Sequence, residues 1–136
     1  MDKEIEILAK TIYGETTTPS VSNAESIANV ILNRVKYAKS NVGHWWGNCV
    51  SEVCLKPMQF KCWDIQHPNH EKLAHIRQGD PFFTVCRRIA VRAIKGLLND
   101  NTKGATCYHD KNCHPQWAYA AVPCADIGGK LFYTII

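Results

Sequence analysis

Two segments with helical apolar spacing, separated by a short polar turn, constrain the fold of this chain more than any other feature. The first segment covers residues 3–13 and repeats apolar residues at the spacing that buries one helix face: Ile5, Leu8, Ala9 and Ile12. Thr16–Pro19 breaks the pattern. The second segment starts at a capping box, with Ser22 at the N-cap and Glu25 three residues later, and continues to about Tyr37. Helices joined by so short a loop are expected to pack against each other.

Glu15 lies where the first helix meets this loop, so it is expected at the junction of the two helices. A carboxyl group at a helix end, beside a cleft and among apolar neighbours, is suited to general acid catalysis. The alternative interpretation is an ordinary solvated glutamate at a helix end. The next carboxylate along the chain, Glu25, is interpreted as a capping residue rather than a catalytic one.

The rest of the chain predicts a mainly helical α+β fold with a small C-terminal β-hairpin. Residues 41–79 have little periodicity and are interpreted as ordered loops, rich in aromatic residues that line a cleft or cover the core. No repeat or linker divides the sequence, so residues 1–136 are expected to form one domain. The expected elements are a short helix near 48–54, a helix from Asp80-Pro81 to about Leu98, and strands near 105–109 and 130–135.

The composition is that of a globular protein with a mild basic bias. Of 136 residues, 46% are hydrophobic and 21% charged, and the net charge is +4. This bias is compatible with an anionic polymer such as nucleic acid or bacterial wall, but no nucleic-acid-binding motif is present. No apolar run is long enough to cross a membrane, so membrane insertion is not expected. The basic residues of the helical segments are interpreted as solvated faces: Arg34, Lys36, Lys39, Arg87, Arg88, Arg92 and Lys95.

Seven cysteines and six histidines raise two alternatives for the chemistry. Reduced thiols are the default expectation, with Cys86 packed as a small hydrophobe. One alternative is a Cys/His nucleophile based on Cys62 or Cys107, although nothing marks either thiol as activated. The other is a metal site, although no spacing matches a recognised zinc motif. Its candidate ligand sets are His67/His70/His75, Cys49/Cys54/Cys62 and Cys107/Cys113/His114.

Several blocks of sequence resemble the spore-cortex-lytic and cell-wall hydrolase family of the SleB–CwlJ type. They follow the family's order over nearly the whole chain, and the Asn33-Arg34-Val35 helix and the Gln59-Phe60-x-Cys62-Trp63 segment are the most specific. The matching blocks are Leu8–Glu15, Ser26–Val35, Pro57–Trp63, Gly104–His109, Pro115–Ala118 and Ile127–Tyr133.

The resemblance implies a small, lysozyme-related, mainly helical catalytic domain that acts on peptidoglycan. The family's catalytic glutamate falls on Glu15, and a second glutamate that the family commonly has three residues later is Thr18 here. No metal or cofactor is implied. The matched residues expected around the substrate are Gln59, Phe60, Trp63, Tyr108, His109 and Trp117, with hydrophobic core as the rival interpretation of each aromatic residue.

The expected activity is therefore cleavage of the MurNAc–GlcNAc β-1,4 bond of peptidoglycan glycan strands by a monomer, as a lytic transglycosylase with Glu15 as acid and then base. The alternatives are a metal-dependent amidase that cuts between MurNAc and the stem peptide, and a wall-binding module without catalysis. The N-terminus has no signal-peptide pattern. We therefore expect synthesis in the cytoplasm with release as in phage lysis, or a domain of a larger exported protein.

Overall fold

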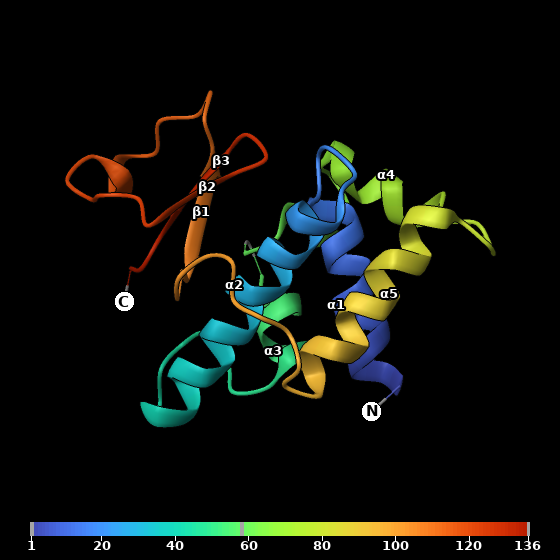
Figure 1. The fold of residues 1–136 in the computed structure, drawn as a ribbon, viewed down its shortest axis with the longest axis horizontal. Coiled ribbons are helices and arrows are strands. Elements are labelled where there is room, and N and C mark those ends of the chain that lie inside the picture. Colours follow the sequence, from blue (N-terminus) through green and yellow to red (C-terminus); the bar gives the residue numbers. More distant parts are fainter. Residues whose placement is uncertain (1, 58, 136) are drawn as a thin grey trace.

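Three long helices form the frame of the molecule (Figure 1): α1 (Asp2–Glu15), α2 (Val21–Ser40) and α5 (Pro81–Ile94). Both α1 and α2 pack against α5. The computed structural model describes residues 2–57 and 59–135; Met1, Met58 and Ile136, which the predicted domain also includes, lie outside them. The helix α5 ends before the predicted Leu98 because Gly96 adopts a φ of 75°, which leaves the helical conformation.

The predicted start of α2 is wrong by two residues. Ser20, not Ser22, is the N-cap, and its hydroxyl accepts a hydrogen bond of 3.1 Å from the Asn23 N–H. Glu25 consequently lies inside the helix rather than in a capping box, and its carboxylate is 3.9 Å from Arg92 on α5.

The main hydrophobic core lies between the helices, as the apolar spacing predicted. Leu8, Ile12, Ile27 and Ile31 are fully buried or nearly so. All seven cysteines are free thiols. Cys86 is fully buried and packs in this cluster, which confirms its role as a small hydrophobe. This burial raises the pKa of the Cys86 thiol to about 12.

The segment between α2 and α5 contains more helix than was predicted. Besides the expected short helix, α3 (Val50–Leu55), it forms the 3-10 helix η1 (Lys61–Trp63) and the helix α4 (Pro68–Ala74). His67 caps α4 by accepting a hydrogen bond of 3.1 Å from the Asn69 N–H, and proline occupies the first helical position.

A three-stranded antiparallel sheet lies on the opposite side of α2 from α1 and α5 (Figure 1). The two predicted strands, β1 (Cys107–Asp110) and β3 (Lys130–Tyr133), pair with Tyr108 opposite Phe132. A third strand, β2 (Ala125–Ile127), was not predicted and pairs with the other edge of β3. Between β1 and β2 lies the 3-10 helix η2 (Gln116–Ala118). The fold is thus the expected mainly helical α+β type with a small C-terminal sheet.

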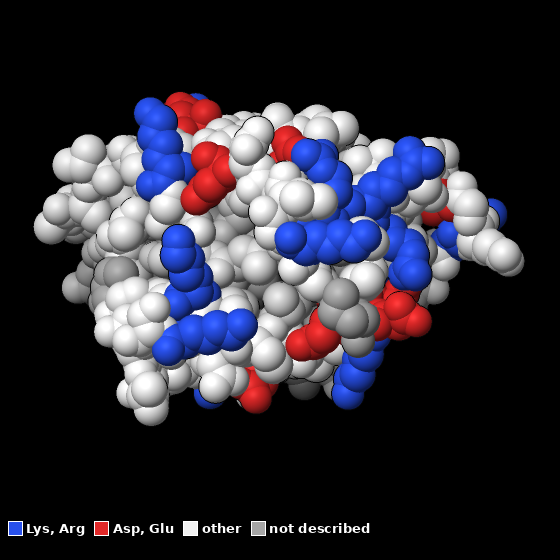
Figure 2. All heavy atoms as spheres, turned by 60° about the horizontal axis from the view of Figure 1, so that its bottom comes forward, with Lys and Arg blue, Asp and Glu red and all other residues white. Residues whose placement is uncertain are grey.

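Basic side chains are interspersed with acidic ones on the face shown in Figure 2. On the face shown in Figure 2, Lys and Arg gather mainly on the side of α1 and α5, with Asp and Glu between them. Arg87, Arg88, Arg92 and Lys95 are exposed, as predicted for a solvated face of α5. Among the described residues, no helix combines the length and apolar character that a membrane span requires.

Candidate active site

Glu15 is the last residue of α1, and the chain turns away from the helix directly after it. Thr16 is buried, and both its N–H and its hydroxyl donate to the Ile12 carbonyl, at 3.0 and 2.6 Å. These bonds satisfy a carbonyl of the last helical turn and fix where the helix stops. The Glu15 side chain is therefore presented, half-buried, at the edge of the helical frame.

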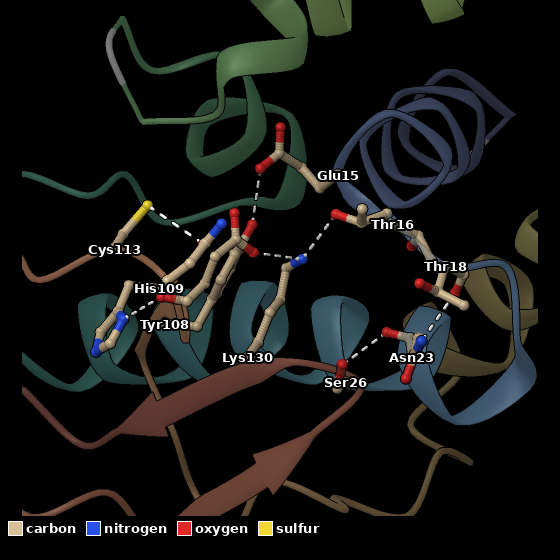
Figure 3. Close-up of polar contacts among 12 residues, drawn as sticks. Glu15, Thr16, Thr18, Asn23, Ser26, Tyr108, His109, Cys113 and Lys130 are labelled. Carbon is tan, nitrogen blue, oxygen red and sulfur yellow. Dashed lines mark hydrogen bonds and ion pairs between the residues drawn. The ribbon is translucent and has the colours of Figure 1, made fainter.

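Both oxygens of Glu15 accept hydrogen bonds from segments far away in the sequence. The Cys62 N–H in η1 donates to Oε2 at 3.1 Å. The Tyr108 hydroxyl in β1 donates to Oε1 at 2.8 Å (Figure 3). One bond comes from the helical part and one from the sheet. The carboxyl group is therefore oriented from two sides, which is what a catalytic acid requires.

Gly14 allows η1 to approach α1 closely enough for the bond from Cys62. A Cβ at residue 14 would lie 2.4 Å from the Cβ and 2.9 Å from the Sγ of Cys62, closer than side-chain atoms approach. The Cys62 side chain is fully buried. Burial and the neighbouring Glu15 carboxylate raise the pKa of its thiol far above the usual range. Cys62 consequently lacks the thiolate that a nucleophile needs.

Tyr108 stays protonated and so remains a hydrogen-bond donor. Burial, followed by the charge and the hydrogen bond of Glu15, raises the pKa of the Tyr108 phenol well above 10.0. Its ring packs on Phe132 of the neighbouring strand, with 5.6 Å between centroids. Tyr108 therefore anchors the sheet to Glu15 at any physiological pH.

Lys130, which the sequence analysis did not single out, braces the same arrangement (Figure 3). It lies on β3 with only 8% of its surface exposed. Its ammonium group donates to the Thr17 hydroxyl at 3.1 Å and pairs with Asp110 at 3.0 Å. It also lies 5.9 Å from the centre of the Tyr108 ring. Lys130 thus joins the sheet to the loop that follows Glu15.

Arg34 was predicted to lie on a solvated helix face, and that prediction is wrong. The residue is 7% exposed. Its Nε donates to the Thr106 carbonyl at 2.6 Å and its Nη1 to Gln59 Oε1 at 3.1 Å. The guanidinium lies 5.3 Å from the ring centres of both Trp46 and Phe60. It therefore links α2 to the segment before η1, through Gln59, and to the segment before β1, through Thr106.

A cleft of about 860 Å³ opens in front of Glu15, between η1 and α4 on one side and the sheet with η2 on the other. Five of the six residues predicted around the substrate line it together with Glu15: Gln59, Phe60, Tyr108, His109 and Trp117. The core interpretation holds for Phe60 as well, because the residue is only 3% exposed and packs in the main core. The sixth residue, Trp63, packs against this core without lining the cleft, and its indole N–H donates to the buried Thr11 hydroxyl at 2.8 Å.

The sheet wall presents aromatic surface to the cleft. Trp117 is 43% exposed and meets the ring of His109 edge-on at 5.7 Å. His109 Nε2 is 2.9 Å from the Tyr133 hydroxyl, which fixes the imidazole. Exposed rings held in this way suit the apolar faces of sugar rings.

Among the described residues that line the cleft, the only carboxylate besides Glu15 is that of Asp110. Asp110 is paired with Lys130. Glu25, the other acid considered, does not line the cleft. Asp64, close to η1 in the sequence, does not line it either and accepts a hydrogen bond of 3.0 Å from the Gln66 N–H. Thr18 is exposed in the loop after α1, and its carbonyl accepts a hydrogen bond from Asn23 at 2.8 Å.

The residues considered as metal ligands have other roles or lie apart. His67 caps α4, and His70 Nδ1 is 2.8 Å from the Cys62 carbonyl. Within residues 2–57 and 59–135, no three His, Cys, Asp or Glu side chains converge as ligands for an ion. The contact made by Cys107 is with Arg34, whose Nη2 lies 3.9 Å from its sulfur.

Comparison with known proteins agrees with this geometry. The family model described as "Cell Wall Hydrolase" matches residues 20–133. This chain belongs to the cell wall hydrolase family. Membership confirms the family that the sequence blocks indicated and the assignment of an enzyme that degrades cell walls. The match begins after Glu15, so the catalytic role that the sequence resemblance implied for that residue stays a prediction.

Two solved structures share the fold of this cell wall hydrolase. The catalytic domain of the Bacillus cereus SleB protein is 21% identical with a TM-score of 0.72, covering 98% of this chain and 91% of that one. The catalytic domain of the germination-specific lytic transglycosylase SleB from Bacillus anthracis is 22% identical with a TM-score of 0.74, covering 98% of this chain and 96% of that one. No curated protein sequence matches the chain significantly.

Proposed function

We propose that residues 1–136 form one catalytic domain, a lytic transglycosylase that cleaves the MurNAc–GlcNAc β-1,4 bond of peptidoglycan. Membership of the cell wall hydrolase family and the likeness to the Bacillus anthracis lytic transglycosylase support this class of reaction. The enzyme acts as a monomer on the wall and needs no cofactor. It reaches the wall after release from the cytoplasm, as in phage lysis, or as a domain of a larger exported protein.

The proposal depends mainly on one observation. Among the described residues that line the cleft, Glu15 is the one acid that is not engaged in an ion pair. Glycosidases that use water or a covalent intermediate generally need two carboxyl groups facing the bond. The other carboxylate in this cleft, Asp110, is engaged by Lys130 at 3.0 Å. A mechanism with one acid therefore fits the site better than a mechanism with two.

The substrate supplies the missing nucleophile in this mechanism. Protonated Glu15 donates its proton to the glycosidic oxygen as the bond between MurNAc C1 and GlcNAc O4 breaks. The resulting carboxylate then removes the proton from the C6 hydroxyl of MurNAc, whose oxygen bonds to C1. The products are a 1,6-anhydro-MurNAc end and a free GlcNAc O4 hydroxyl, and Glu15 recovers its proton.

The residues around Glu15 provide orientation and binding. The Cys62 N–H and the Tyr108 hydroxyl hold the carboxyl group while it changes charge, because each oxygen accepts one hydrogen bond and retains a second lone pair. We assign substrate binding to Gln59, His109 and Trp117, which line the cleft. Phe60 also lines the cleft, but it is only 3% exposed and packs in the main core, so we assign it to the shape of the wall rather than to stacking on a sugar. The aromatic rings stack on sugars and the polar groups bind N-acetyl groups.

The test is mass spectrometry of the soluble products after digestion of purified peptidoglycan, without chemical reduction. Muropeptides that end in 1,6-anhydro-MurNAc are expected. Reducing-end MurNAc would show that water attacks, and free stem peptides would show an amidase. Either result would overturn the proposal.

Replacement of the acid sharpens this test. Glu15→Gln keeps the size of the side chain but cannot donate and recover a proton, so the rate of wall solubilisation is expected to fall by about a thousandfold or more. Circular dichroism should show an unchanged fold. Wall clearance at the wild-type rate by the variant would exclude Glu15 as the catalytic residue.

A further inference from the structure

The two walls of the cleft differ in how their charges are balanced. On the sheet side, Lys130 is neutralised by Asp110 at 3.0 Å. On the side of η1 and α4, Lys61 and Lys72 line the cleft, and among the described residues neither has an ion-pair partner. The cleft therefore has one wall with two uncompensated positive charges.

The acids of the same segment do not compensate these lysines. Asp64 and Glu71 are exposed and do not line the cleft. His67 adds a further donor on this wall, because its Nδ1 accepts from the Asn69 N–H at 3.1 Å and leaves Nε2 to carry the proton of the neutral ring. A wall of unpaired cations and donors inside a cleft favours an anionic group of the ligand.

The position of the two lysines relates this anion to the reacting bond. Lys61 directly precedes Cys62, whose N–H holds Glu15 at 3.1 Å. Lys72 lies on α4, which packs against η1. A glycan bound with its scissile oxygen at Glu15 therefore has the lysine wall beside it. In peptidoglycan, the stem peptide leaves the MurNAc ring close to that bond and carries free carboxylates.

We propose that Lys61 and Lys72 form a subsite for a carboxylate of the stem peptide attached to the MurNAc residue at which the strand is cut. This inference rests on the proposed function and specifies its substrate as glycan that still bears charged peptides. Each lysine contributes a solvent-accessible ionic contact, so the subsite mainly lowers KM and does not take part in the chemical step.

The experiment compares two double variants with the same change in net charge. Lys61→Glu/Lys72→Glu reverses the proposed subsite, whereas Lys39→Glu/Lys95→Glu reverses two exposed lysines outside the cleft. The main substrate is peptidoglycan stripped of secondary wall polymers, either native or with its carboxyl groups amidated. A further sample of native peptidoglycan keeps its phosphate-bearing polymers. Muropeptide release is measured as a function of substrate concentration.

For the cleft variant on native peptidoglycan, KM is expected to rise about tenfold while kcat stays within about twofold of the wild type. The control variant is expected to stay near wild type. On amidated peptidoglycan, the wild type and the cleft variant should have the same KM, because the anion is gone.

Three outcomes would overturn the subsite. The first is an equal KM of the cleft and control variants on native peptidoglycan. The second is a difference between wild type and cleft variant that persists on amidated peptidoglycan. The third is a difference that arises only when phosphate-bearing wall polymers are left on the substrate, which would assign the lysines to phosphate. A wild-type enzyme that releases no glycosidic products is a different result, because it contradicts the proposed function itself.

Discussion

The helical part and the sheet part of the molecule contribute equally to the surroundings of Glu15 but are built very differently. The helical part surrounds a core cluster that draws on α1, α2, α3 and α5. The sheet part has a small cluster whose buried members are Val30, Ala105 and Phe132. The acid and the Cys62 amide thus belong to a well-packed frame, whereas Tyr108, His109 and Lys130 stand on a sheet with little core of its own.

This difference implies that the sheet is located by individual polar links rather than by extensive packing. Arg34 bonds the Thr106 carbonyl at 2.6 Å, Tyr108 bonds Glu15 at 2.8 Å, and Lys130 bonds Thr17 at 3.1 Å. We expect changes in the frame to alter stability, and changes at Tyr108 or Lys130 to alter chiefly the geometry of the cleft. Arg34 is both a link and a buried residue of α2, so its loss should alter both. Four substitutions test this division.

Arg34→Ala is expected to have the largest effect, because Arg34 belongs to both parts. The change removes hydrogen bonds to the Thr106 carbonyl and to Gln59 and empties the space between two aromatic rings. We expect a loss of about 3 kcal/mol in the free energy of unfolding, measured by urea denaturation. Arg34→Lys keeps the charge without the planar fork and should lose about half as much. A loss below about 1 kcal/mol for Arg34→Ala would contradict the link.

Gly14→Ala tests the frame directly. The added Cβ meets Cys62 at 2.4 Å, so α1 and η1 must separate. We expect a cost of about 2 kcal/mol in the free energy of unfolding, together with a lower kcat because the Cys62 N–H moves away from Glu15. In the double variant Gly14→Ala/Cys62→Gly the clashing side chain is gone, and both quantities should recover in part. If Gly14→Ala is as stable as the wild type, α1 and η1 can separate without cost and the close approach at Gly14 does not contribute to stability.

Lys130→Met tests a link of the sheet, and the same sheet offers a control. Lys130 is nearly buried in the cleft, whereas Lys111 pairs with Asp126 at 2.8 Å on the surface, where both side chains are about half exposed. For Lys130→Met we expect a roughly tenfold loss of kcat with about 1 kcal/mol of lost stability. Lys111→Met should leave both unchanged within error. Similar kcat values for Lys130→Met and Lys111→Met would show that Lys130 has no role in positioning the site.

The smallest effect is expected from Asp100, in the turn that leads from α5 to the sheet. Partial burial disfavours its charged form, but hydrogen bonds from Thr102, Asn33 and Gly104 outweigh this and lower the pKa of Asp100 below its usual value of 3.8. A lowered pKa in the folded state stabilises the protein above pH 3.8, and the contribution is lost as pH falls through the folded value. Asp100→Asn should therefore reduce stability at neutral pH by less than about 1 kcal/mol. In the variant, stability should also fall less steeply as the pH is lowered. The measurement is the thermal unfolding temperature from about pH 6 to about pH 2. If the variant loses stability in acid as steeply as the wild type, groups other than Asp100 cause that loss.

Features set by local sequence were predicted well. The spacing of Leu8 and Ile12 placed the buried face of α1, and the break at Thr16 placed Glu15 at the helix end. The Asp80-Pro81 pair also predicted the start of α5 correctly. In the structure, the Asp80 carboxylate caps the helix by accepting a hydrogen bond from the Phe83 N–H at 2.9 Å. In each case, the residues that predict the feature and the residues that form it lie within one or two helical turns of each other.

The strand β2 had a local signal that was overlooked. Gly128 and Gly129, with φ angles of 58° and 82°, form the two-residue turn between β2 and β3. Two consecutive glycines between apolar residues are typical of such a hairpin. The Ser20 cap was misassigned for another reason, since Ser20 and Ser22 are both good caps and only the path of the chain decides between them.

The buried charges of the site had no local signal. Arg34 and Lys130 have the sequence context of surface residues, and their partners Thr106 and Thr17 are 72 and 113 positions away. Spacing within a helix or strand carries no information about such contacts. For Arg34 the family resemblance was the available clue, because the residue lies in the Asn33-Arg34-Val35 block.

One of the two bonds that orient Glu15 comes from a peptide group rather than a side chain. Every residue type except proline would offer the same N–H at position 62. Substitutions there by residues other than proline can change the packing against Gly14 but cannot delete the donor itself. The Tyr108 bond, by contrast, disappears with the loss of one hydroxyl group. The acid is thus held on one side by a contact that tolerates mutation and on the other by one that a single substitution removes.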